Sequence, residues 1–431
     1  MKVKIFTLGC KVNQFESQAI IDTLTKKGYC TADEKESADV TIINSCAVTA
    51  ASESKAVKLI NRIRREDPET VILLTGCMAQ TQNGEEKRLK DVDIILGNKR
   101  RSDIVKVLED YFREQHKITY IEPYGKNDEY ENLAVSDFSN RTRAFLKIED
   151  GCNRFCSYCI IPYARGRVRS CSLEYIRDEV KAFAANGYKE IVIVGINLSC
   201  YGSDIGISFS DGIVTACNAA DVRIRLGSLE PESMTLETLK KFASCENFCP
   251  QFHLSLQSGC DATLKRMNRH YTTADYEKIV NDIHSVFENA AITTDVMVGF
   301  AGETDEDFEK SVAFVEKTGF SKVHVFPYSR RQGTAADRAP NQIPENVKKE
   351  RAAIMTCAAK RSREKFLNSQ IGRVEPVLIE TRNRNGKYEG YTPNYTLVYT
   401  DADESMINKV VNVKLLSTDG ESCFGNIVST G

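Results

Sequence analysis

Short apolar runs alternate with amphipathic stretches along the first 115 or so residues of the chain. The apolar runs have the length of buried strands, and the stretches between them repeat their apolar positions at helical spacing. Strands are predicted at 2–8, 40–44, 71–75 and 94–96, and helices at 14–27, 52–66 and 102–115. This alternation predicts a doubly wound α/β domain with a parallel sheet over residues 1–120, followed by a polar linker at 121–140.

A second, longer alternation begins near residue 143. Strands are predicted at 144–149, 190–195, 221–226, 251–256, 291–298 and 322–327, with helices between them, for example at 174–186, 274–288 and 305–317. Six such units predict a (βα)6 partial barrel over residues 141–367, which a basic helix at 345–367 closes. The active site of such a barrel lies at the carboxyl ends of its strands.

The last part of the chain, residues 368–431, changes to short strand-like runs separated by turn residues. Strands are predicted at 374–381, 388–391, 395–399, 410–417 and 423–429. Several short strands in succession predict a small β-barrel.

Composition narrows the class of protein. The 431 residues exceed one ordinary core, and 42% hydrophobic with 27% charged residues is ordinary for a globular protein. No apolar run of about 18 residues predicts a membrane helix, and the first six residues resemble a strand more than a signal peptide, so a cytoplasmic protein is expected. The net charge of −2 means that any contact with nucleic acid depends on local basic patches.

Fifteen cysteines are many for such a chain, and in a reducing compartment they are not expected to form disulfides. Three of them, Cys152, Cys156 and Cys159, form a C-x3-C-x2-C motif directly after the first predicted barrel strand. Three thiolates at this spacing can hold three irons of a cubane cluster and leave the fourth iron open. The alternative is a structural zinc site, but no fourth cysteine or histidine lies nearby in the sequence to complete a tetrahedron.

This motif in this loop resembles the radical S-adenosylmethionine (SAM) superfamily. The resemblance implies that Cys152, Cys156 and Cys159 are the catalytic cluster ligands and that the open iron binds the amino and carboxylate groups of SAM. It also implies that electron transfer splits SAM and leaves a 5′-deoxyadenosyl radical, so that the cofactor supplies the difficult chemistry.

Three further cysteines each follow a predicted strand of the first domain: Cys10, Cys46 and Cys77. Loops at the carboxyl edge of a parallel sheet converge, so these thiols are expected to meet at one point. Neighbouring glycines at positions 9 and 76 allow the backbone to approach a bulky ligand. Taken singly, a cysteine beside a strand more often belongs to the core, but together the three predict a second four-iron–four-sulfur cluster.

The two cysteine sets resemble those of the methylthiotransferase family, and the resemblance covers almost the whole chain. The matching segments are TLGCKVNQ at 7–14, NSCAVT at 44–49, TGCMAQ at 75–80, IP at 161–162, RGR at 165–167, LSLQSG at 254–259, TDVMVGF at 294–300, FPYS at 326–329 and GT at 333–334. The resemblance implies a cluster domain, a radical SAM barrel and a small RNA-binding TRAM-like barrel, in that order. It implies replacement of C–H by C–SCH3, with one SAM methylating a sulfur and a second generating the radical.

Segments at 8–14, 225–231 and 257–261 most resemble one subgroup of this family. That subgroup modifies carbon 2 of N6-threonylcarbamoyladenosine beside the anticodon of tRNA. The resemblance therefore implies tRNA as a partner, together with an electron donor such as flavodoxin or ferredoxin. The sulfur donor and the oligomeric state are left open.

Residues at the ends of barrel strands, where polar groups can bind ribose or carboxylate, are the candidates for holding SAM, although each could equally be a structural cap. They are Gly195, Asn197, Ser228, Glu230, Gln257, Ser258 and Asp295. Donors near the first cysteine loop and in basic clusters are the candidates for holding the substrate: Lys11, Asn13, Gln14, Arg165, Arg167, Arg330, Arg382 and Arg384. The five histidines form no metal-binding pair by sequence and are expected in surface or core positions.

Three alternatives remain at this level. The same chemistry could act on isopentenyladenosine in tRNA, or on an aspartate side chain of a ribosomal protein. A chain of another class, a non-enzymatic iron–sulfur RNA-binding protein, would leave the open-iron spacing and the barrel unexplained.

Overall fold

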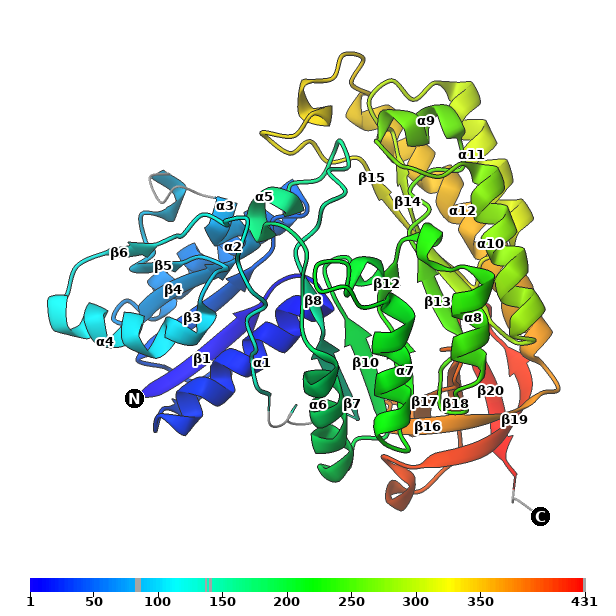
Figure 1. Cartoon of the computed structure of the whole chain (residues 1–431), viewed down its shortest axis with the longest axis horizontal. Helices are drawn as coiled ribbons and strands as arrows, with labels where there is room; N and C mark the ends of the chain where they lie inside the picture. Colours follow the sequence, from blue (N-terminus) through cyan, green and yellow to red (C-terminus); the bar gives the residue numbers. More distant parts are fainter. Residues whose placement is uncertain (82–86, 136–137, 139–141, 429–431) are drawn as a thin grey trace.

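The computed structural model describes residues 1–81, 87–135, 138 and 142–428, and its three parts follow one another along the chain (Figure 1). In the first part, six strands form one sheet in the order β2-β1-β3-β4-β5-β6, and all of its pairings are parallel. The strands are β1 (Lys2–Thr7), β2 (Cys30–Thr31), β3 (Val40–Ser45), β4 (Val71–Gly76), β5 (Ile94–Leu96) and β6 (Ile118–Tyr120). Every residue of β3 and β4 is buried, because helices cover both faces of the sheet.

The helices of this part are α1 (Lys11–Lys26), α2 (Ala50–Glu66), α3 (Cys77–Thr81) and α4 (Ile104–Glu114). Helix α2 begins where it does because the side chain of Thr49 accepts a hydrogen bond from the Ser52 amide. Two apolar clusters, one on each face of the sheet, form the core. The prediction of a doubly wound α/β domain is confirmed.

The second part contains the predicted barrel strands, arranged in two parallel sheets with the orders β11-β10-β7 and β12-β13-β14-β15. The strands are β7 (Arg143–Lys147), β10 (Glu190–Val194), β11 (Arg223–Leu226), β12 (Ser228–Leu229), β13 (Gln251–Leu254), β14 (Ala291–Val298) and β15 (Lys322–Pro327). Strands β11 and β12 continue one another across Gly227, whose amide still donates to the carbonyl of Ile193. The partial barrel is confirmed, with one strand divided between two sheets.

Helices lie outside these sheets, except that the short α5 (Ile161–Arg165) lies beside α3 of the first part (Figure 1). They are α5 (Ile161–Arg165), α6 (Leu173–Ala185), α7 (Phe209–Ala219), α8 (Leu236–Ala243), α9 (Asp261–Arg266), α10 (Thr273–Val286), α11 (Asp305–Thr318) and α12 (Glu345–Gln370). Both Thr272 and Thr304 form capping boxes that define the first residues of α10 and α11. A short antiparallel pair, β8 (Glu149–Asp150) with β9 (Arg169–Ser170), closes the loop 151–168 at its base.

The third part is a closed five-stranded barrel in the order β16-β17-β18-β20-β19. The strands are β16 (Val374–Arg382), β17 (Tyr388–Tyr391), β18 (Leu397–Thr400), β19 (Val410–Thr418) and β20 (Cys423–Ile427). The strand predicted from residue 395 begins later, because residues 392–396 form a turn with Tyr395 at a φ of 68°. The small β-barrel is confirmed, and residue 429 of its last predicted strand lies outside the described residues.

The predicted linker at 121–140 packs against the barrel where it is described. Leu133, Val135 and Phe138 are buried in the core of the second part, and residues 136–137 and 139–140 lie outside the described residues. Among the helices that the structure describes, none has both the length and the apolar character needed to cross a bilayer.

Candidate functional site

The three cysteines of the first part lie at the carboxyl edge of its sheet. Cys10 precedes α1, Cys46 follows β3, and Cys77 opens α3 directly after β4. A Cβ atom at Gly9, where φ is 124°, would lie 3.0 Å from the Cβ of Cys46, so glycine permits the close approach of these loops. All three residues are free thiols, and burial raises the pKa of Cys46 to about 11. The three loops therefore lie at the same edge of the sheet, and the common ligand of their thiols stays a prediction.

Asn13 connects the loops that carry two of these thiols. Its Nδ2 donates to the carbonyl of Leu8 at 3.2 Å and to that of Ser45 at 3.1 Å, and its Oδ1 accepts from the Cys10 thiol at 3.3 Å. The side chain is 1% exposed. Asn13 was expected to hold substrate, and the structure assigns it instead to the loops around the thiols.

Arg165 also differs from its predicted role as a substrate ligand. Its guanidinium is fully buried and donates to Glu16 at 2.6 Å, to Asp150 at 3.2 Å and to the thiol of Cys77 at 3.2 Å. Lys147 joins the same acids, at 3.3 Å from Glu16 and 3.1 Å from Asp150. This buried ionic network links the first part to the barrel, so Arg165 is not open to a substrate.

Burial alone would raise the pKa of Glu16, but the charges of Arg101, Arg165 and Lys147 outweigh it and lower that pKa to about 2. The carboxylate therefore stays ionised in the folded protein at any ordinary pH.

The second cysteine set lies in the loop that β8 and β9 close. The Sγ of Cys152 accepts from Asn197 Nδ2 at 3.5 Å, that of Cys156 from Arg269 at 3.4 Å, and that of Cys159 from the Ile161 amide at 3.4 Å. Burial raises the pKa of Cys152 to about 11 and that of Cys159 to about 12. Donors aimed at sulfur favour the thiolate form, which iron ligation requires.

Neither cysteine set is compact enough for a single zinc ion. Among the residues that the structure describes, three ligand atoms lie within 4.8 Å of one another only at His253, Asp295 and His324. Four ligands around one zinc, at a Zn–S distance of about 2.3 Å, place their sulfurs only about 4 Å apart. The wider spacing, with three free thiols in each set, suits a cubane cluster better than the zinc alternative.

The candidate SAM ligands divide between two places. Asn197 touches Cys152, and Glu230 pairs with Arg269, which itself donates to Cys156. The Oε1 of Gln257 is buried with no partner among the described residues, and its backbone has a φ of 66°. At Gly195, a Cβ atom would lie 2.6 Å from the side chain of Glu149. Glycine therefore lets the backbone pass close to this buried carboxyl group.

The remaining three candidates lie elsewhere. Ser258 is fully buried and shares a hydrogen bond of 2.9 Å with Ser311, so it has a structural role in place of the predicted one. Ser228 and Asp295 line a separate cavity of about 510 Å³. Asp295 lies 3.2 Å from the Nε2 of His253 there.

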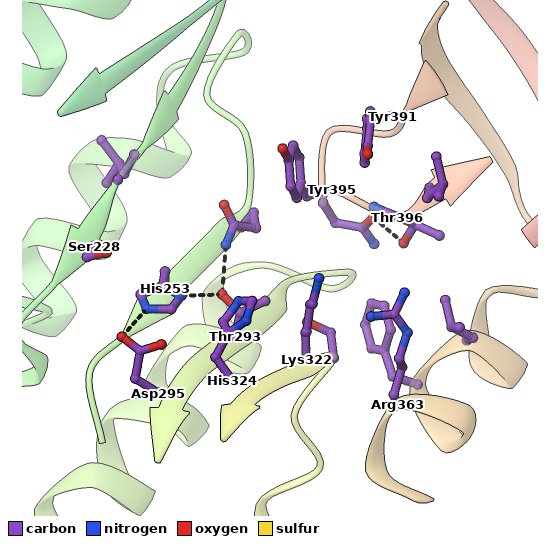
Figure 2. Close-up of a pocket in the computed structure, with 18 of the residues that line it drawn as sticks. Ser228, His253, Thr293, Asp295, Lys322, His324, Arg363, Tyr391, Tyr395 and Thr396 are labelled. Carbon is purple, nitrogen blue, oxygen red and sulfur yellow. Dashed lines mark hydrogen bonds and ion pairs between the residues drawn. The ribbon is translucent and has the colours of Figure 1, made fainter. Parts of the chain in front are cut away.

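That cavity lies where the three parts meet (Figure 2). Lys11 contributes from the first part, strands β13 to β15 line it from the barrel, and Tyr391 and Tyr395 face it from the third part. Desolvation, with Arg225 and Arg143 nearby, lowers the pKa of Lys11 to about 8. Among the described residues, Lys11 is the predicted substrate ligand that lines this cavity.

The other predicted substrate ligands are dispersed. Gln14 lies in the first turn of α1, where its backbone N–H donates a hydrogen bond to the carbonyl of Cys10. Arg167 is exposed, and Arg330 is exposed and paired with Asp337 at 2.9 Å. Arg382 and Arg384 lie at the hairpin between β16 and β17, with Arg382 over the ring of Tyr388.

Several residues at these sites were not predicted from the sequence. His253 and His324 were expected to form no pair, yet their ring centroids are 5.8 Å apart beside Asp295. Lys322 lies in the same cavity, and Arg269 and Glu149 lie beside the barrel cysteines. Period-two alternation along β13, β14 and β15 could have placed 253, 295, 322 and 324 on one face.

Comparison with known proteins supports this assembly of parts. Three family models match: "Uncharacterized protein family UPF0004" over residues 2–97, "Radical SAM superfamily" over 146–315 and "TRAM domain" over 368–428. The matched ranges follow the three parts of the fold.

Curated relatives match along nearly the whole chain. Threonylcarbamoyladenosine tRNA methylthiotransferase MtaB of Thermotoga maritima is 39% identical over 99% of this chain and 98% of its own. The Bacillus subtilis protein of the same name is 37% identical over 96% of this chain and 93% of its own. A tRNA-2-methylthio-N(6)-dimethylallyladenosine synthase of Clostridium botulinum is 35% identical over 98% of this chain and 96% of its own.

Solved structures agree on the fold. The radical SAM methyltransferase TsrM of Kitasatospora setae, solved with cobalamin and a [4Fe-4S] cluster, superimposes with a TM-score of 0.58 at 13% identity, over 78% of this chain and 77% of its own. With the curated relatives covering almost its full length, the chain belongs to the radical SAM methylthiotransferase family.

Proposed function

We propose that this protein methylthiolates tRNA, converting N6-threonylcarbamoyladenosine beside the anticodon to its 2-methylthio derivative. The names of the Thermotoga maritima and Bacillus subtilis relatives support this substrate. The TRAM match and the cavity at the junction of the three parts support a nucleic-acid substrate that contacts more than one of them.

We also propose two four-iron–four-sulfur clusters, one on Cys10, Cys46 and Cys77 and the other on Cys152, Cys156 and Cys159. The observation that supports this arrangement best is the position of the five-residue helix α5. At its start the Ile161 amide donates to Cys159, and at its end Arg165 donates to Cys77. A helix rises 1.5 Å per residue, so α5 itself is about 8 Å long, and one short element contacts both thiol sets.

When bound, the clusters and SAM supply the reducing equivalent, the hydrogen-abstracting chemistry and the site for sulfur transfer. The chain's own residues position and shield them. Asn197 donates to the Cys152 sulfur and Arg269 to the Cys156 sulfur, and the Gln257 Oε1, which has no partner among the described residues, offers an acceptor just after β13. Ala47, Cys77 and Ala164 form a buried apolar contact at the start of the path between the two sets.

A small electron-transfer protein such as flavodoxin or ferredoxin is the reductant in this proposal. The proposal also includes a cytoplasmic location, since all fifteen cysteines are free thiols and such a compartment keeps thiols reduced.

The decisive experiment is nucleoside mass spectrometry of tRNA. A host that makes threonylcarbamoyladenosine but lacks its methylthiolation receives the gene or its Cys152→Ala variant. We expect 2-methylthio-threonylcarbamoyladenosine with the intact protein only. If 2-methylthio-isopentenyladenosine accumulates instead, as the name of the Clostridium botulinum relative would suggest, or if a ribosomal protein is methylthiolated, the proposed substrate is wrong.

A further inference from the structure

Two lysines line the cavity at the junction of the three parts. Lys11 stands at the first turn of α1, next to Cys10, and Lys322 is the first residue of β15. Neither ammonium has a hydrogen bond or ion pair to any residue in the described part of the chain. Figure 2 shows Lys322 extending from its strand into the space beneath Tyr395.

The other charged residues that line the cavity are already paired. Asp295 lies 3.2 Å from His253, and Arg363 lies 3.2 Å from Glu421. With those pairs set aside, the unbalanced charge that faces the cavity is positive. A partly open cavity lined by ammonium groups that have no partner among the described residues is a site for an anion, and a carboxylate or phosphate oxygen is the group that pairs with them.

Aromatic side chains form another wall of the same cavity. The rings of Tyr391 and Tyr395 stack with centroids 4.6 Å apart and planes 19° apart. The guanidinium of Arg225 lies 4.6 Å from the Tyr395 ring centroid and pairs with Glu190. These contacts hold the Tyr395 ring in one position. Aromatic rings beside ammonium groups can bind a nucleobase that carries an acidic substituent.

We propose that this cavity receives the modified base and that Lys11 and Lys322 bind the carboxylate of its amino-acid side chain. This assignment rests on the proposed function, which supplies a threonyl carboxylate on the base. It makes the two lysines specificity-determining residues, because a neutral hydrophobic substituent would leave both ammonium groups desolvated and unpaired.

The remaining cations near the site are unsuitable for this role. Arg165 is buried among Glu16, Asp150 and Cys77, and Arg143 pairs with Glu380 at 2.8 Å. A backbone phosphate of the tRNA is the other source of an anion for the same lysines. The two sources differ in one respect that can be measured, since only the carboxylate changes when the base is altered.

The test uses full-length reconstituted enzyme and two anticodon stem-loop RNAs. One RNA carries threonylcarbamoyladenosine and the other carries the same nucleoside with its carboxylate converted to a carboxamide. The kcat/KM for methylthiolation is measured for the wild type, Lys11→Gln and Lys322→Gln. Lys27→Gln, which removes an exposed lysine at the opposite end of α1, is the matched control.

We expect the wild type to prefer the acid over the carboxamide by about tenfold to a hundredfold, the usual range for a hydrogen bond to a charged group. Each glutamine variant should lose most of that preference by slowing on the acid alone, while Lys27→Gln keeps it. Iron content and far-UV circular dichroism of each variant verify that Lys11→Gln retains its neighbouring cluster and fold, and Lys322→Gln tests the same idea away from the cysteines.

Equal losses on both RNAs, with a shallower dependence of tRNA binding on salt, would assign the lysines to phosphate and overturn the proposal. Unchanged discrimination in both variants would also overturn it. If the wild type modifies neither RNA, the proposed function itself fails, and this outcome is distinct from the other two.

Discussion

The Nε of Arg165 lies 3.2 Å from the Sγ of Cys77, so a barrel residue donates directly to a thiol of the first part. The same guanidinium pairs with Glu16 and Asp150. Three partners on two parts of the chain hold it in one geometry, which fixes the edge of one cysteine set relative to the barrel. The junction between the parts is thus built on charge as well as on apolar packing.

Replacing Arg165 by Met should destabilise this junction strongly. The variant keeps a long side chain but leaves Glu16 and Asp150 buried with one partner fewer, and breaking a buried ion pair from one side typically costs about 3–5 kcal/mol. Urea unfolding of the reconstituted protein measures the change. Arg167→Met, two residues away and exposed, is the matched control and should change stability by less than about 0.5 kcal/mol. A loss no larger than that of the control would contradict the role given to the network.

Acid should weaken the same junction through Glu16. Its pKa is about 2 in the folded protein and near 4.5 when unfolded, so the unfolded state binds the proton first. The contribution is therefore complete above pH 4.5 and is lost as the pH falls toward 2. Urea midpoints of the apoprotein between pH 7 and pH 3 should fall more steeply for the wild type than for Glu16→Gln. Parallel curves for the two proteins would show that Glu16 does not carry this dependence.

The strands and helices could be predicted because their apolar periodicity is local. The alternation of strands also placed Cys10, Cys46 and Cys77 at one sheet edge, since parallel topology alone brings those loops together. The doubly wound domain, the partial barrel and the small β-barrel all follow from patterns within windows of about 20 residues.

The role of Arg165 could not be predicted in the same way. Its partner Glu16 lies 149 residues earlier in the chain, and only the docking of two parts brings them together. A basic residue beside a glycine looks identical in sequence whether it meets a substrate or a buried acid. Lys322 escaped notice for the same reason, because its cavity exists only once α1, β15 and the third part meet.

Gln257 should contribute to SAM binding. Its Oε1 is buried without a partner in the described structure, and such an acceptor loses free energy unless a ligand satisfies it. Gln257→Leu should therefore raise the KM for SAM by about tenfold, the effect of losing one hydrogen bond of about 1.4 kcal/mol. Ser258→Ala is the matched control, since its hydroxyl is bound to Ser311 instead. Similar KM values for SAM in the two variants would remove Gln257 from the SAM site.

Removing the first-part cysteines should separate two activities. The triple variant Cys10→Ala, Cys46→Ala and Cys77→Ala should bind about four irons where the wild type binds about eight, since each cubane holds four. It should still cleave SAM to 5′-deoxyadenosine, because the cysteines that Asn197 and Arg269 contact, Cys152 and Cys156, are unchanged, and it should fail to methylthiolate tRNA. Iron analysis, chromatography of the cleavage products and nucleoside mass spectrometry measure the three quantities on one preparation.

The matching triple variant at Cys152, Cys156 and Cys159 should also hold about four irons but lose SAM cleavage. If the first variant loses cleavage while its barrel cluster and fold remain intact, the two thiol sets do not have separate roles. If the wild type never exceeds about four irons, only one of them holds a cluster.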